Sequence, residues 1–155
     1  MGEIIPEENP AEAKPIIEAI REYFLDCDLL QTDSPLGVEN LSKEESYSIN
    51  QLPSQGEGVL KSYINGDKVY GFDFTFASRF AYTEASSTQI ANSGFYEGLV
   101  KWIKEETAKG NLPEVDGAME IKVTQTPYVF MADPSGKSAE YQILLQLVYK
   151  RKGSI

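Results

Sequence analysis

The side chains best suited to chemistry in this chain are carboxylates, because its 155 residues include no histidine and one cysteine. Asp26, Asp28 and Asp33 lie close together and could supply oxygen ligands to a cation. A calcium loop, however, places ligands at regular alternate positions with a glycine and a terminal glutamate, and that pattern is missing. The pairs Glu44–Glu45 and Glu105–Glu106 are adjacent, so their side chains point apart and form no dyad. We interpret these carboxylates as solvated groups and predict no catalytic and no metal-binding residue.

The lack of histidine removes the commonest general base, the commonest metal ligand and the base of Ser-His and Cys-His nucleophile pairs. One cysteine without histidine cannot supply the usual zinc sites, and it cannot form an intramolecular disulfide. Cys27 stands between Asp26 and Asp28, whose charges raise the pKa of a thiol. We therefore predict that Cys27 is a buried or half-buried structural residue at a helix end.

Nucleotides and nucleic acids are also poor candidates as ligands. Gly56-Glu57-Gly58 and Ser135-Gly136-Lys137 do not have the spacing of a phosphate-binding loop, so we predict no cofactor. The aromatic residues of segment 70–82 could stack RNA bases, but basic residues do not accompany them. The formal net charge of −10 repels phosphates, and we expect no sequence-specific nucleic-acid binding. Core packing is the favoured interpretation of the aromatic segment.

Length and composition indicate one folded domain spanning residues 1–155, with an acidic and flexible segment at 1–9. No apolar run approaches 18 residues, so we expect no membrane-spanning segment and no membrane partner. The acidic N-terminus lacks the basic start and long apolar stretch of a signal peptide, which favours a cytoplasmic protein.

Hydrophobic periodicity predicts two helices and a set of strands. The first helix starts either at Pro10 or near Lys14 and ends at about Cys27, and the second spans about 86–109. Asn65-Gly66 lies between two strand patterns and predicts a hairpin. The predicted strands are 46–52, 59–64, 68–82, 119–124, 128–132 and 139–150. This order predicts an α+β fold, an antiparallel or mixed sheet with both helices packed on one face.

Two strands of this set carry the candidate protein-contact residues. Residues 128–132 are apolar on both sides, so this strand is either buried on both faces or in contact with another protein. The last strand alternates large apolar residues from Tyr141 to Tyr149, and its other face is too mixed for a plain solvent surface. The candidate interface residues are Tyr128, Phe130, Met131, Leu144 and Val148.

The chain from Lys68 onward resembles the tail-terminator (tail-completion) proteins of siphophages and prophages, which are often labelled minor capsid proteins. The residues that carry the resemblance are the arms around Asn65-Gly66, the segments 70–76 (YGFDFTF) and 95–103 (FYEGLVKWI), Leu112-Pro113, the strand around Ile121, and 139–143 (AEYQI). They extend over about two thirds of the chain.

The resemblance implies a structural role in virion assembly and not an enzyme. Such proteins form rings, usually hexameric, that cap the tail tube and join it to the head connector. The implied partners are further copies of the chain, the tail tube protein and the head connector protein. The implied location is the virion, and the host cytoplasm during assembly. An acidic surface suits a ring whose bore lets DNA slide through.

Two other function classes stay open. The first is a small-ligand-binding or protein-interaction α+β module, and binding of a small ligand requires a closed apolar cavity between helix and sheet. An enzyme that uses carboxylates alone requires two of them facing one cleft. We favour the structural protein over both.

Overall fold

The computed structural model describes residues 14–30, 36–38, 46–81, 86–132 and 138–153. Its elements follow the order α1 (Ile16–Leu25), β1 (Leu36–Val38), β2 (Ser46–Gln51), a 3-10 turn (Gly56–Gly58), β3 (Val59–Ser62), β4 (Lys68–Ala81), α2 (Ser86–Ala108), β5 (Ala118–Ala132) and β6 (Ser138–Arg151). Two helices and a mixed sheet make an α+β fold, as predicted. Segment 1–9, Asp33, Glu44–Glu45 and the turn at 135–137 lie outside the described residues.

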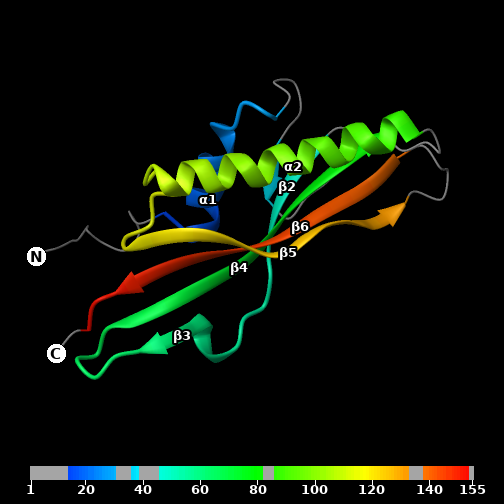
Figure 1. The fold of residues 1–155 in the computed structure, drawn as a ribbon. Helices are drawn as coiled ribbons and strands as arrows, with labels where there is room; N and C mark the ends of the chain where they lie inside the picture. Colours follow the sequence, from blue (N-terminus) through cyan, green and yellow to red (C-terminus); the bar gives the residue numbers. More distant parts are fainter. Residues whose placement is uncertain (1–13, 31–35, 39–45, 82–85, 133–137, 154–155) are drawn as a thin grey trace, which may run out of the picture.

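The sheet has the strand order β1-β2-β4-β6-β5, and β3 pairs with the beginning of β4 (Figure 1). The pairing of β1 with β2 is parallel and the other pairings are antiparallel. The C-terminal strand β6 lies in the middle of the sheet and pairs with β4 from Lys68↔Arg151 to Ala81↔Ser138. The strand β5 therefore lies at one edge of the described sheet.

Both helices pack on the aromatic face of β4, as predicted. Phe76 of this face is fully buried and contacts Phe24 of α1 and Tyr96 of α2, with ring centroids 5.2 and 6.5 Å apart. The neighbouring strand β6 adds the predicted alternating residues to the same core, because Ile143 pairs with Phe76. Burial of this continuous apolar surface is the main stabilising contribution to the fold.

The helix ends follow the chemistry of proline and glycine. Pro15 is the N-terminal cap of α1 with an extended ψ of 146°, which agrees with the predicted start near Lys14. The alternative, a helix from Pro10 kinked at Pro15, depends on residues 10–13, which lie outside the described residues. After α2, Gly110 takes a positive φ of 82°, a conformation that glycine adopts without the strain of a side chain.

One prediction about strands was wrong. The predicted strands 119–124 and 128–132 form one strand, β5, with irregular register on both sides of Gln125. Pro127 does not end this strand, because β5 is an edge strand and a missing N–H costs little there. The short strand β1 was not predicted. No helix in the described part of the chain is long and apolar enough to cross a membrane.

Candidate functional site

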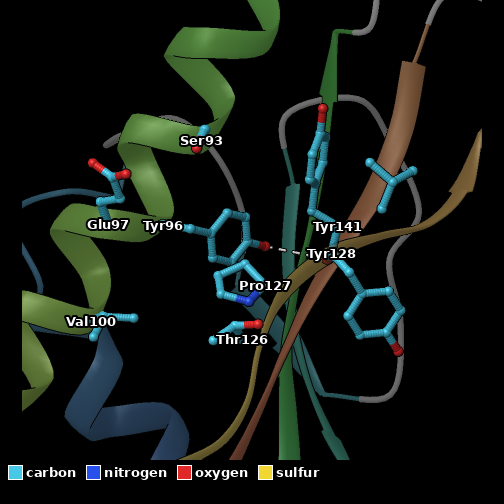
Figure 2. A pocket seen from close by; sticks show the side chains of 9 residues that line it. Ser93, Tyr96, Glu97, Val100, Thr126, Pro127, Tyr128 and Tyr141 are labelled. Carbon is cyan, nitrogen blue, oxygen red and sulfur yellow. Dashed lines mark hydrogen bonds between the residues drawn. The ribbon is translucent and has the colours of Figure 1, made fainter.

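A groove of about 590 Å³ lies between α2 and the second half of β5. Its α2 wall consists of residues three and four positions apart, which share one helix face. Figure 2 shows the Tyr96 ring reaching from α2 toward β6, with Pro127 close to it. The lining residues are Ser93, Tyr96, Glu97 and Val100 of α2, Thr126, Pro127, Tyr128 and Val129 of β5, and Tyr141 of β6. The groove is therefore largely apolar, and Glu97 is the only charged residue among the described residues that line it.

Hydrogen bonds fix the floor of the groove. The hydroxyl groups of Tyr96 and Ser78 are 2.6 Å apart, and Tyr96 donates to the carbonyl oxygen of Tyr141 at 3.2 Å (Figure 2). Asn92 Nδ2 donates to the hydroxyl oxygen of Tyr141 at 3.1 Å. Burial raises the pKa of the Tyr96 hydroxyl well above its usual range, so this phenol stays neutral. The floor is thus a rigid, satisfied surface, suited to contact more than to proton transfer.

From the groove, which Val129 also lines, to its end, β5 presents consecutive apolar side chains to solvent. The exposed fractions of Val129, Phe130 and Met131 are 45%, 49% and 58%. Tyr128 is half-buried, points away from α2 in Figure 2, and donates from its hydroxyl to Gln142 Oε1 at 3.1 Å. Burial of this strand on both faces within the chain was therefore a wrong alternative, and contact of one face with another protein stays a prediction. We call Val129, Phe130 and Met131 the β5 strip.

The structure brings three of the five predicted interface residues together in one place. Tyr128, Phe130 and Met131 lie in the second half of β5, and Leu144 is a half-buried residue of the adjacent strand β6. Val148 differs, because it is only 5% exposed and lies opposite Gly71 in the sheet. Its side chain therefore belongs to the interior of this chain. Contact of the four remaining candidates, Tyr128, Phe130, Met131 and Leu144, with a partner stays a prediction.

Sequence reasoning did not find the α2 wall of the groove. Helical spacing predicts a packing stripe on this helix formed by Phe95, Leu99, Trp102 and Ile103. That stripe omits Tyr96, which is only 1% exposed. Its adjacency to Phe95 was the available signal, because two aromatic residues in succession widen the apolar face of a helix.

A second, polar cleft of about 390 Å³ lies between α1 and the segment after α2. Lys14 Nζ bonds to Glu22 Oε1 and, at 3.2 Å, to Glu114 Oε1. Three carboxylates, those of Glu22, Asp26 and Glu114, line this cleft, and Lys14 joins the first to the last. A carboxylate enzyme would need at least two such groups in one cleft. The bond to Glu22, followed by the bond to Glu114, raises the pKa of Lys14. These groups are largely exposed, and such ion pairs contribute little to stability.

Of the adjacent pair Glu105–Glu106, Glu106 makes contacts that stabilise the end of a helix. Glu106 accepts hydrogen bonds from Asn111 and from Lys109, which lower the pKa of its carboxyl group in that order and tie down the end of α2. Among the described residues, no three Asp, Glu or Cys side chains gather in a way that could hold a metal ion.

Cys27 is buried, as predicted, with an exposed fraction of 4%. Burial raises the pKa of its thiol, which keeps the sulfur protonated near neutral pH. We expect iodoacetamide to modify Cys27 at least about tenfold more slowly in the folded chain than in concentrated urea, at both pH 7.5 and pH 8.5. Mass spectrometry of quenched samples measures both rates. Equal rates in the two states would mean that the thiol is accessible.

Comparison of the sequence with protein-family models and with curated proteins finds no match.

Proposed function

We propose that this chain is a structural protein of tail-terminator type, which self-associates into a ring, caps a phage tail tube and joins it to the head connector. The observation that carries the proposal is the β5 strip, three consecutive apolar residues exposed on an edge strand. Exposed apolar surface next to free strand edges is a liability unless a partner covers it. In a protein assembly, a neighbouring subunit would cover this exposed apolar surface.

Two features of the sequence specify the kind of assembly. The order and spacing of the segments from Lys68 onward resemble those of tail terminators. The partners that this resemblance implies are further copies of the chain, the tube protein and the connector protein. The net charge of −10 suits a ring through which DNA passes without sticking.

The direct test adds the purified chain to the polymerising tail tube protein of the same phage or prophage and measures tube lengths by negative-stain electron microscopy. We expect short, capped tubes with the natural chain and long tubes with Met131→Asp, because a buried aspartate would be unpaired in the contact. Met119→Asp is the matched control, since Met119 lies at the other end of β5 and is 51% exposed.

Tube lengths unaffected by the natural chain would refute the proposed function. If Met131→Asp capped tubes as efficiently as the natural chain, the β5 strip would not be part of the contact.

A small-ligand-binding module is the second candidate, and the groove is the observation that favours it. Its volume of about 590 Å³ falls within the range of ligand pockets, and its lining is largely apolar. Saturable binding of an apolar fluorophore to a monomer that leaves tube lengths unchanged would favour this candidate over the ring protein.

A further inference from the structure

We propose that the hairpin β3–β4 of one copy inserts its tip into the groove between α2 and β5 of the next copy. This inference rests on the proposed self-association and identifies the two surfaces that meet. The tip comprises residues 63–66, between β3 and β4.

The hairpin tip is an exposed apolar projection. Ile64 is fully exposed, and Leu60 and Tyr63 are 50% and 40% exposed. The ammonium groups of Lys61 and Lys150 each lie over the Tyr63 ring, 5.1 Å from its centroid. Together with Leu60 and Tyr63, Ile64 gives the hairpin an exposed apolar end, the kind of surface that marks contact with a partner.

Local hydrogen bonds hold the tip in one conformation. The N–H of Tyr63 donates to the Asp67 carbonyl at 2.8 Å, and the N–H of Gly66 donates to the Tyr63 carbonyl at 3.0 Å. Asp67 Oδ1 accepts the N–H of Gly153 at 2.7 Å, which joins the hairpin to the C-terminal end of β6. A projection that is already ordered loses little conformational entropy when it binds.

The hairpin end is basic, whereas the rest of the chain is strongly acidic. Residues 59–69 and 149–153 contain five cations and one carboxylate, which leaves four net positive charges at the hairpin end. The whole chain has a net charge of −10, so the remainder carries fourteen net negative charges. At the groove, Glu97 is exposed, and Glu140 lies opposite Met131 of the β5 strip. A basic hairpin is thus attracted to the acidic remainder of a second copy. The five cations are Lys61, Lys68, Lys150, Arg151 and Lys152.

A chain cannot fill its own groove with its own hairpin. The hairpin lies at the Lys68 end of β4, whereas Tyr141 of the groove pairs with Ser78 near the other end. Ten residues of strand separate these positions, which corresponds to about 33 Å at about 3.3 Å per residue. Figure 1 shows the β3 hairpin and the end of β5 at opposite sides of the molecule. The contact therefore joins two copies through different surfaces, the head-to-tail arrangement that closes into rings.

Disulfide trapping tests this contact. In a Cys27→Ala background, the variant with Ile64→Cys and Val129→Cys carries one cysteine on each proposed surface. Oxidation with copper phenanthroline, with and without the tube protein, is expected to give a ladder of covalent oligomers longer than dimers on non-reducing gels. Each single-cysteine variant stops at dimers. The matched control pairs Ile64→Cys with Met119→Cys, and we expect no ladder from it, because Met119 lies outside the groove.

Charge reversal tests the electrostatic part of the contact in the same trapping assay. Lys61→Glu and Glu97→Lys are each expected to lower the yield of oligomers severalfold, and their combination is expected to restore it. A combination no better than the weaker single variant would overturn the proposed charge pairing.

The outcomes separate this inference from the proposed function. If the chain shortens tubes but the double-cysteine variant gives no more ladder than its Met119 control under either condition, the hairpin contact is refuted and the terminator role stands. If the ladder forms and tube lengths do not change, the contact stands and the terminator role is refuted.

Discussion

Replacing Phe76 with alanine is expected to lower the free energy of unfolding by about 3–5 kcal/mol, the range for removal of a buried aromatic ring. The Phe76 side chain is fully buried, and its ring lies 5.2 Å from that of Phe24 and 5.7 Å from that of Tyr47. It therefore contacts α1 and β2 as well as α2, and the sheet and helices cannot all close over the space it would leave. Urea unfolding followed by the fluorescence of Trp102 measures the effect. Trp102 is the only tryptophan and lies 5.9 Å from Phe24.

The control for this prediction is Phe130→Ala, which removes the same ring from the β5 strip. Phe130 is 49% exposed, so we expect its removal to cost less than about 1 kcal/mol of stability. Equal losses for the two variants would mean that the helices do not pack on the aromatic face of β4.

The elements that could be predicted are those whose signal is contained in a short stretch of sequence. The aromatic face of β4, the alternation of β6 and the Asn65-Gly66 turn are local patterns, and the structure confirms each of them. The position of both helices on one face follows from the same patterns, because each apolar stripe needs a partner surface.

The features that could not be predicted depend on contacts between distant segments. The strand β1 has three residues, too few for any periodicity, and it forms because Leu36 pairs alongside Tyr47. Val148 is buried although its neighbours on the same face are mixed, because burial depends on which segments cover that face. The groove exists only where α2 approaches β5, and neither segment alone indicates how close the two are.

Pro127 illustrates a local rule that the fold overrides. A proline commonly ends a strand, since it cannot donate to the ladder. In β5 the proline falls in the irregular stretch between Gln125 and Tyr128, at the edge of the sheet. The same proline predicts an edge or a bend for residues 128–132, and the strand order confirms the edge position.

The second large effect is expected for Gly117→Ala, which should lower the free energy of unfolding by about 2–5 kcal/mol. Gly117 has a positive φ of 77°, and a β-carbon at this position would overlap the carbonyl oxygen of Lys150. The same two residues are joined by a hydrogen bond from the N–H of Lys150 to the carbonyl of Gly117, 2.9 Å long. The backbone of β6 therefore passes so close to the turn before β5 that only glycine fits.

The variant Gly110→Ala separates the two causes of this loss of stability, which are the strain of a positive φ and the overlap of the β-carbon with the Lys150 backbone. Gly110 has a similar φ of 82°, but the space around its α-carbon is open, so alanine there should cost only the strain of the left-handed conformation, about 1–2 kcal/mol. The difference between the two variants in urea unfolding measures the close approach of the turn to β6. Hydrogen exchange at the Lys150 amide should quicken in Gly117→Ala and stay unchanged in Gly110→Ala, because only the first substitution forces the two backbones apart. Equal costs for both variants would mean that the turn and the C-terminal strand are not in contact.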